Sequence, residues 1–333
     1  MQLNLRYDMN TPDFGASHPA MYRAAIDQAA WADKLGFTQV FLAEHHGAEG
    51  GYCPSPMILA GAVLGATRHI VAHLSALVVT LHDPLRLAED LSVLDNLSDG
   101  RIWITAGMGY RPHEFEMFDR DIAKRLAIQN EVMATLKAAW TGEPFEFRGR
   151  TVRVTPKPVS PGGPKIYMGG STDKSAIRAA KNGYQYFPGH PDLFEIYKTE
   201  RAAAGFPPPE PQMKPAASFL YVSDDPERDW PIVAPHVAYA TNTYAEWAKE
   251  RGVGDTRYKA AETVEALKAM PNIKVVTPDQ CFDYLKELGA GTAVTFHALL
   301  GGLDPEVSWR SLKLFEKEVL PRLVAEGLVT GKP

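Results

Sequence analysis

Short apolar runs alternate with segments of helical periodicity along most of the chain. Apolar stretches of five to seven residues bounded by glycine or polar turns, such as residues 38–44 and 101–107, are typical of strands buried in a sheet. After Pro84, by contrast, Leu87 and Leu91 recur on one face, which is typical of a helix that covers such a sheet. The pattern therefore predicts alternating strands and helices.

The alternation is regular enough to be counted. Strands are predicted at residues 3–6, 38–44, 69–79, 101–107, 164–170, 184–189, 216–222 and 292–299. Helices are predicted at residues 20–35, 55–67, 84–98, 121–140, 174–182 and 191–204, with one that begins after Thr277 and a last one that ends before Pro321. Eight strands, most of them followed by a helix, favour an α/β fold of the TIM (β/α)8 barrel type. The alternative, a doubly wound open sheet, would bind a dinucleotide through a glycine fingerprint, and the nearest stretch, GMGYRP, has Pro112 in place of the third glycine.

Two segments interrupt the alternation. Residues 141–165 contain two short runs of period two and are predicted to form a surface β-hairpin insertion. Residues 223–276 are rich in Trp, Tyr and helical patterning, and are predicted to form a helical insertion that could cover an active site. Both insertions are assigned to a single barrel domain that spans residues 1–333.

Composition and charge narrow the class of protein. The chain has 333 residues, 45% of them hydrophobic, and a net charge of −5 without long runs of one sign, which does not favour a nucleic-acid surface. No stretch approaches the ~18 apolar residues of a membrane-spanning helix, and the N-terminus lacks a signal-peptide pattern, so a cytoplasmic location is expected. Cys53 and Cys281 cannot form a disulfide framework and lack the spacing of metal ligands.

The C-terminal ends of the predicted strands gather the residues that could carry chemistry, because catalytic groups of a TIM barrel lie at that end. The residues expected there are Glu44, His45, His46, Ser75, Ala76, Gly107, Met108, Arg111, Gly169, Gly170, Ser171, His190 and His297. Small side chains among them, at Ser75, Ala76 and Gly107, leave room for a flat heterocycle.

The stretch FLAEHH presents an acid and two imidazoles where a strand ends. Adjacent residues of an extended strand point to opposite sides, so His45 and His46 do not easily share one metal ion, and no HExxH spacing accompanies them. No metal site is predicted. We interpret His45 as a group that transfers protons or hydrogen-bonds, oriented by Glu44, and His46 as a capping or packed side chain.

The stretch YMGGSTDKSAIRAA allows two interpretations. The free amides of a helix start, with nearby hydroxyls and the charge of Lys174, suit a phosphate group. An ordinary strand-to-helix turn with an N-cap would look the same. The residues alone leave both open.

Four stretches together resemble one family. GFTQVFLAEHH, LHDPLRLAEDLSVLDNLSDGRIWITAGMGYRPHEF, PGGPKIYMGGSTDKSAIRAAKNG and SLKLFEKEVLPRL are similar, in order, to the bacterial luciferase-like flavin monooxygenases. The resemblance implies a (β/α)8 barrel, generally a homodimer, that takes reduced flavin mononucleotide (FMN) from a separate flavin reductase. It also implies that the flavin and dioxygen form a hydroperoxide, which oxygenates a small apolar substrate.

The resemblance also assigns roles to residues. It makes His45 the catalytic imidazole, to which our own interpretation adds Glu44 as a catalytic partner, and it places a non-proline cis peptide at Ser75-Ala76 under the flavin ring. It also matches Gly170, Ser171 and Ser175 to the phosphate-binding turn. The full set predicted to hold the cofactor is Ser75, Ala76, Gly107, Met108, Arg111, Gly169, Gly170, Ser171, Lys174 and Ser175. One departure is that Met108 stands where the luciferases carry an arginine for the flavin phosphate, for which Arg111 or Lys174 could substitute.

The substrate and two alternatives remain open. Tyr7, His113, Trp230 and Tyr239 are predicted to line the substrate pocket, and their mixed polarity does not name the substrate. A dehydrogenase or reductase that uses a deazaflavin of the coenzyme F420 type would have the same barrel. A non-catalytic flavin-binding relative is the second alternative.

Overall fold

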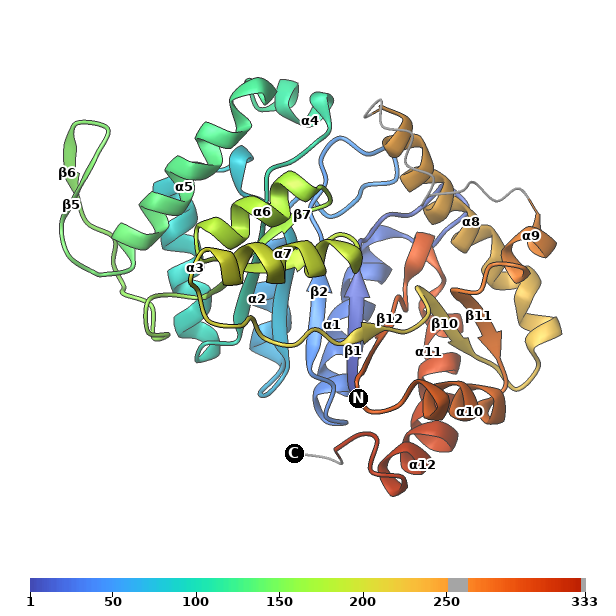
Figure 1. Ribbon diagram of the computed structural model, residues 1–333. Helices are drawn as coiled ribbons and strands as arrows, with labels where there is room; N and C mark the ends of the chain where they lie inside the picture. The colour runs from blue at the N-terminus through green and yellow to red at the C-terminus, as the bar shows by residue number, and fades with distance from the viewer. Residues whose placement is uncertain (251–262, 331–333) are drawn as a thin grey trace.

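The computed structural model describes residues 1–250 and 263–330 of the chain, and a curled parallel sheet lies at its centre (Figure 1). The strand order in this eight-stranded sheet is β8-β7-β4-β3-β2-β1-β12-β9. Its strands are β1 (Gln2–Tyr7), β2 (Gln39–Leu42), β3 (Val71–Val78), β4 (Ile102–Gly107), β7 (Lys165–Gly170), β8 (Gln185–Pro188), β9 (Lys214–Pro215) and β12 (Thr292–Phe296). All neighbours pair in parallel, so their C-terminal ends lie at the same edge of the sheet.

Helices cover the outer face of this sheet. They are α1 (His18–Asp33), α2 (Pro56–Ala66), α3 (Pro84–Ser98), α5 (Arg125–Ala139), α6 (Asp173–Lys181), α7 (Asp192–Ala203), α10 (Pro278–Leu288), α11 (Pro305–Leu314) and α12 (Leu320–Ala325). Alternate strand residues such as Leu5 and Val40 are fully buried in the same core cluster as Ala25 and Ala29 of α1. The TIM-type α/β fold predicted from the alternation is therefore confirmed.

The seventh predicted strand is not part of this sheet. Residues 219–222 form β10 (Phe219–Val222), which pairs in parallel with β11 (Ile273–Val276) in a separate two-stranded sheet. The place beside β12 is taken instead by the two-residue strand β9. All four residues of β10 are buried, because two of them pack into the main core and two into a second apolar cluster.

The first predicted insertion holds the expected hairpin, and the second holds a strand besides its helices. Residues 145–147 and 150–152 form the antiparallel pair β5 and β6, with Arg148 and Gly149 at positive φ in the turn, and this hairpin projects from the body of the molecule (Figure 1). The segment 223–276, predicted to be a helical insertion, contains α8 (Pro226–Glu250) and α9 (Val264–Lys268) and in addition the strand β11, which its pattern did not indicate. Residues 251–262 of that segment lie outside the described residues.

Two helical features were not predicted. A short helix, α4 (Pro112–Met117), follows β4. The last helix does not end before Pro321, because a π-helical turn at Phe315–Val319 leads into α12, where proline near the helix start forfeits no hydrogen bond. In the described part of the chain, none of the helices is long and apolar enough to span a bilayer.

Candidate active site

His45 lies just beyond β2 and is held by a carboxylate from α4. Its Nδ1 is 2.7 Å from Oε1 of Glu114, and the same oxygen accepts a hydrogen bond from the backbone N–H of His46 at 3.1 Å. Glu114 is fully buried, and its other oxygen, Oε2, has no hydrogen-bond partner among the described residues. The prediction that Glu44 orients His45 is therefore wrong, since Glu114 occupies that position.

Glu44, just beyond β2, accepts hydrogen bonds from groups other than His45. Its Oε1 accepts hydrogen bonds from Nε2 of His46 and of His82, each at 2.9 Å, and its Oε2 accepts one from the backbone N–H of Val78 at 2.5 Å. Burial alone would raise the pKa of this carboxyl group, but the bonds from the two imidazoles and Val78 lower the pKa to about 2. Glu44 is thus an ionised anchor that ties β2 to the end of β3. The expectation that His46 is packed away agrees with its 7% exposure.

A non-proline cis peptide joins Ser75 to Ala76 in β3, as the family resemblance implies. The carbonyl of Ala76 accepts a hydrogen bond from the amide of Glu44 at 3.3 Å. Gly107, at the end of β4, lies directly against this peptide, because a Cβ atom there would be 3.0 Å from Cβ of Ala76 and 3.3 Å from the carbonyl oxygen of Leu77. Only glycine therefore leaves the backbone at the barrel mouth this close and uncovered.

Aromatic side chains cover His45. Its ring lies 4.8 Å from that of Tyr52 and 4.6 Å from that of Trp247 of α8, measured between ring centroids. The hydroxyl groups of Tyr52 and Tyr244 are 2.6 Å apart, which fixes α8 to the loop after β2. His45 is consequently only 8% exposed.

Arg111 belongs to this cluster rather than to a phosphate site. Its guanidinium carbon lies 4.2 Å from the ring centroid of Trp247, and Nη1 is 3.8 Å from Oε1 of Glu114. Its use as a substitute phosphate anchor is therefore not supported by its position. Lys174, the other candidate, is exposed in the first turn of α6.

Two of the four predicted pocket residues face elsewhere. The hydroxyl of Tyr7 donates to Oε1 of Gln28 in α1 at 2.9 Å, because successive residues of a strand face opposite sides of the sheet. Trp230 packs with Phe219 and Val233 in the apolar cluster beneath β10 and β11. Both were therefore wrongly assigned to the substrate pocket.

The other two lie near the loop after β2. Tyr239 donates to Oδ1 of Asn10 at 3.2 Å, and a Cβ atom on Gly50 would lie 2.3 Å from its hydroxyl. His113 is exposed at the start of α4, and its Nε2 would be 2.6 Å from a Cβ atom on Gly47. Asp8, on the adjoining strand end, is buried, which raises the pKa of its carboxyl group to about 6 against the lowering effect of the Asn10 amide.

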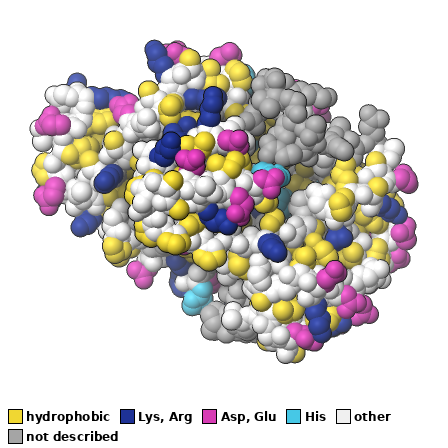
Figure 2. Space-filling view, viewed as in Figure 1, with side chains coloured by type: hydrophobic (Ala, Val, Ile, Leu, Met, Phe, Trp, Pro, Cys, Tyr) yellow, Lys and Arg dark blue, Asp and Glu magenta, His cyan; other side chains and the backbone are white. Residues whose placement is uncertain are grey.

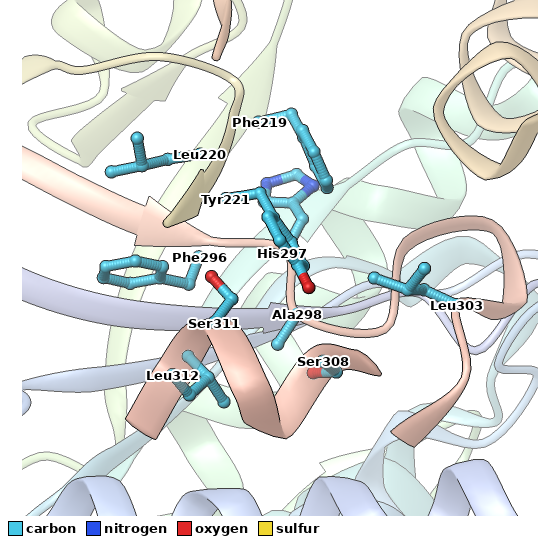
Figure 3. A pocket seen from close by; sticks show the side chains of 10 residues that line it. All are labelled: Phe219, Leu220, Tyr221, Phe296, His297, Ala298, Leu303, Ser308, Ser311 and Leu312. Carbon is cyan, nitrogen blue, oxygen red and sulfur yellow. The ribbon is translucent and has the colours of Figure 1, made fainter. Parts of the chain in front are cut away.

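His190 and His297, which were also predicted at the barrel mouth, lie away from the cluster around His45. His190 lies at the start of α7, with Nδ1 accepting from the backbone N–H of Asp192 at 3.3 Å. His297 follows β12 and lines a cavity of about 10 Å³ between β10, β12 and α11 (Figure 3). Such a cavity holds at most one water molecule and no substrate. Burial, with the charge of Arg6, lowers the pKa of His297 to about 3, so this imidazole is uncharged near neutral pH.

The turn from β7 into α6 is built around a capping box. Thr172 and Ser175 exchange hydrogen bonds between side chain and backbone, and the Ser175 hydroxyl also lies 3.1 Å from that of Tyr186. Ser175 is buried and its hydroxyl is used by the fold, so its predicted contact with a phosphate is not supported. Gly170 packs against it, because a Cβ atom there would be 2.2 Å from the Ser175 oxygen.

Two further residues of the predicted turn, Gly169 and Ser171, lie against neighbouring segments of the chain. A Cβ atom on Gly169 would lie 2.8 Å from Cγ2 of Thr105, and one on Gly189 would lie 2.9 Å from Cβ of Ser171. A side chain at position 169 or 189 would therefore collide with Thr105 or Ser171, which restricts both positions to glycine.

Sequence reasoning missed a pair of arginines beside Met108. Nη2 of Arg178, on α6, lies 3.6 Å from the sulfur of Met108, and Nη1 of Arg125 donates to the carbonyl of Gly109 at 3.4 Å. The sequence signal that could have identified Arg178 was its spacing from Lys174, because residues four apart lie on one face of a helix. Among residues 1–250 and 263–330, no group of three or more His, Cys, Asp or Glu side chains is placed to hold a metal ion.

Comparisons with known proteins point to one family. The model of the family described as "Luciferase-like monooxygenase" matches residues 8–295. The alkanal monooxygenase beta chain of Aliivibrio fischeri is 31% identical over 157 residues, which cover 44% of this chain and 47% of the relative. That of Photorhabdus luminescens is 27% identical over 160 residues, covering 46% and 48%. The chain spans about half the length of the curated relatives it matches.

Solved structures match over nearly the whole chain. Monooxygenase RslO1 from Streptomyces bottropensis has a TM-score of 0.74 at 22% identity, covering 97% of this chain and 99% of that one. The oxygenating constituent of 3,6-diketocamphane monooxygenase from Pseudomonas putida, in complex with FMN, has a TM-score of 0.72 at 19% identity, covering 97% and 98%. A coenzyme F420-dependent tetrahydromethanopterin reductase from Methanopyrus kandleri has a TM-score of 0.61 at 16% identity, covering 96% and 99%. At these identities the likenesses show the fold alone.

Proposed function

The chain belongs to the luciferase-like monooxygenase family, and on that premise we propose that it uses reduced FMN and dioxygen to oxygenate a small, apolar organic substrate. A separate flavin reductase would supply the reduced cofactor. The observation that carries the proposal is the placement of His45, which Glu114 holds at 2.7 Å beside the barrel mouth, on strand ends adjoining the Ser75-Ala76 peptide.

The residues at the mouth fit a flavin. The close approach of Gly107 to Ala76 leaves an uncovered backbone surface that any Cβ atom would fill, and such a surface suits a planar ring. At the other end, the guanidinium groups of Arg125 and Arg178 and the start of α6 suit a phosphate. When bound, reduced flavin supplies the electrons that activate dioxygen.

The side chains of this chain would control protons and water. Because Nδ1 of His45 faces the Glu114 carboxylate, a proton is kept on that nitrogen and Nε2 is left to exchange a proton at the reacting groups. Trp247 and Tyr52 pack over the imidazole and would exclude water from it. Because Trp247 belongs to α8, this helix would act as a cover over the site.

Flavin binding and oxygen uptake test the proposal together. Purified protein is titrated with FMN while the fluorescence of Trp247 and the other tryptophans is followed, and then mixed with a flavin reductase, a nicotinamide and a panel of apolar ketones, aldehydes and alkanes. We expect quenching by FMN and product-coupled oxygen uptake with some member of the panel. Hydride transfer with a deazaflavin and no oxygen uptake would favour the dehydrogenase alternative, and flavin binding without turnover of any compound would favour a non-catalytic protein.

Glu114→Gln is expected to lower turnover by about 10–100-fold, because the amide keeps a neutral hydrogen bond to His45 but cannot stabilise a positive charge on the imidazole. The change should appear in kcat rather than in the affinity for FMN, which steady-state kinetics and flavin titration separate. Glu116→Gln, at an exposed position of the same helix, serves as the matched control. Unchanged kcat in Glu114→Gln would show that the carboxylate does not assist His45.

We further propose that the protein forms a homodimer through α2 and α3. The exposed apolar side chains of Ile58, Val93 and Leu97 lie on these two helices, with exposed fractions of 77%, 49% and 53%. At Gly65 an added Cβ atom would meet nothing within 4 Å, which leaves α2 open to close approach.

Ile58→Glu is therefore expected to shift the protein from dimer to monomer in sedimentation velocity, because a carboxylate would be buried in the contact. Val324→Glu, on α12, is the control for an added charge at an exposed apolar site. A wild-type protein that sediments as a monomer at all concentrations would contradict the proposed dimer.

A further inference from the structure

The side chain of Arg111 is buried against two of the groups that hold His45. Figure 2 shows Lys and Arg side chains at many points of the surface in view, whereas Arg111, at the N-terminal end of α4, is only 6% exposed. Its guanidinium carbon lies 4.2 Å from the ring centroid of Trp247, and its Nη1 lies 3.8 Å from Oε1 of Glu114. Both partners also contact His45, Trp247 at 4.6 Å between ring centroids and Glu114 at 2.7 Å from Nδ1. The four side chains therefore form a closed set of contacts.

The charge of Arg111 supports the buried carboxylate of Glu114. Oε1 of Glu114 accepts hydrogen bonds from Nδ1 of His45 and the backbone N–H of His46, but Oε2 has no hydrogen-bond partner among the described residues. A buried carboxylate charge costs free energy unless donors or a positive charge offset that cost. At 3.8 Å the guanidinium is too distant to donate a hydrogen bond to Oε1, so it acts on Glu114 through its charge.

The contact with Trp247 depends on the shape of the guanidinium. A planar guanidinium stacks on an aromatic face, and Trp is the side chain whose ring attracts a cation most strongly. Trp247 belongs to α8, whereas Arg111 and Glu114 belong to the segment that follows β4. Arg111 therefore joins α8 to α4 directly, in addition to the contacts that both helices make with His45.

We propose that Arg111 is a positioning residue, which links the packing of Trp247 over His45 to the charge of Glu114. This inference rests on the proposed function, because it concerns the residues that would orient the His45 imidazole and exclude water from it. With the guanidinium in place, Trp247 stays packed on His45 while Glu114 faces Nδ1. Without it, Trp247 loses its charged partner and water reaches the imidazole more readily.

Quenching of Trp247 fluorescence by acrylamide tests the packing in purified protein before flavin is added. The Trp247 contribution is obtained by subtracting, for each variant, the signal of the same protein with Trp247→Phe. Arg111→Met, which removes the charge and keeps an apolar side chain, is expected to make Trp247 about two- to fivefold more accessible. Arg111→Lys keeps the charge without the planar stack and should give an intermediate value. Arg148→Met, which removes an exposed arginine of the β5–β6 hairpin, should leave the value unchanged.

The same signal tests the link between Trp247 and Glu114. In Glu114→Gln the guanidinium no longer faces a negative charge, so Trp247 should again become more accessible. When Glu114→Gln is combined with Arg111→Met, we expect no increase beyond that of Arg111→Met alone, because both changes act through one guanidinium. In turnover with reduced FMN and dioxygen, Arg111→Met should form about two- to fivefold less product per flavin oxidised, with an unchanged affinity for FMN.

The outcomes separate this link from a general structural role and from the proposed function. Unchanged accessibility of Trp247 in Arg111→Met, or simple addition of the two effects in the double variant, would overturn the link. An equal rise in the accessibility of all tryptophans would show that Arg111 only stabilises the fold, which also overturns it. If the quenching results hold and no compound is turned over, the link between Trp247 and Glu114 stands and the proposed function fails. Unchanged product per flavin oxidised in an active Arg111→Met would overturn the part of Arg111 in catalysis.

Discussion

Replacing His45 with alanine is expected to lower the rate of substrate oxygenation by about 10²–10⁴-fold in saturating reduced FMN, the range that general acid–base catalysis contributes. The reason is geometric: the imidazole is fixed by Glu114 at one nitrogen and packed between Tyr52 and Trp247, so its other nitrogen is the group available to exchange protons at the mouth. The measurement is product formed per flavin oxidised, because uncoupled oxidation without product is the expected behaviour of the variant.

Two controls make this result interpretable. FMN affinity of His45→Ala should remain close to that of wild type, since the proposed phosphate site, at the start of α6, does not include His45. His69→Ala removes an exposed imidazole that precedes β3, at the opposite end of the strand from the site, and should have no effect. Oxygenation by His45→Ala at the wild-type rate would show that this residue is not catalytic.

The second large effect is on stability, at Glu44. Glu44→Ala is expected to lower the free energy of unfolding by about 3–5 kcal/mol, because removal of the carboxylate leaves the two imidazoles and the Val78 amide without their buried acceptor. Urea denaturation measures the change, with Glu49→Ala as an exposed control in the same loop. A loss below 1 kcal/mol would mean that solvent or a neighbour replaces the carboxylate.

The stability difference should also depend on pH. The folded state lowers the pKa of Glu44 from 4.5 to about 2, so its stabilising effect is fully present above about pH 4.5 and is lost as the pH falls towards 2. The gap in unfolding free energy between wild type and Glu44→Gln should therefore narrow across that window. A gap that stays constant from pH 5 to pH 3 would show that the carboxyl group is not ionised by its contacts.

The alternation of strands and helices was predictable because it depends on neighbouring residues. Burial of β1 to β4 and β7 follows from apolar runs that local sequence specifies, and the capping box at Thr277 with Gln280 marks the start of α10 directly. The partner of a strand is not a local property. Residues 219–222 have the pattern of a barrel strand, but they pair with β11, which lies within a segment whose pattern indicated helices.

Some residues of the candidate site could likewise be predicted from local sequence, and others could not. The histidine after β2 and the glycine-rich turn before α6 could be identified because both lie at strand ends, where a parallel barrel places its chemistry. Glu114 could not, since it belongs to a six-residue helix without periodicity and meets His45 from 69 residues away. Tyr7 was misplaced because strand alternation turns it outward to Gln28.

The sequence by itself therefore determined most of the strands and helices, although not α4 or β11, and it determined which ends of the strands carry reactive groups. Only the tertiary structure decided which carboxylate serves which imidazole, that Trp247 covers His45, and that two arginines meet beside Met108. The physical reason is that periodicity and turn propensity act within a few residues. Charge pairing and burial depend on distances in space, and folding brings distant segments together.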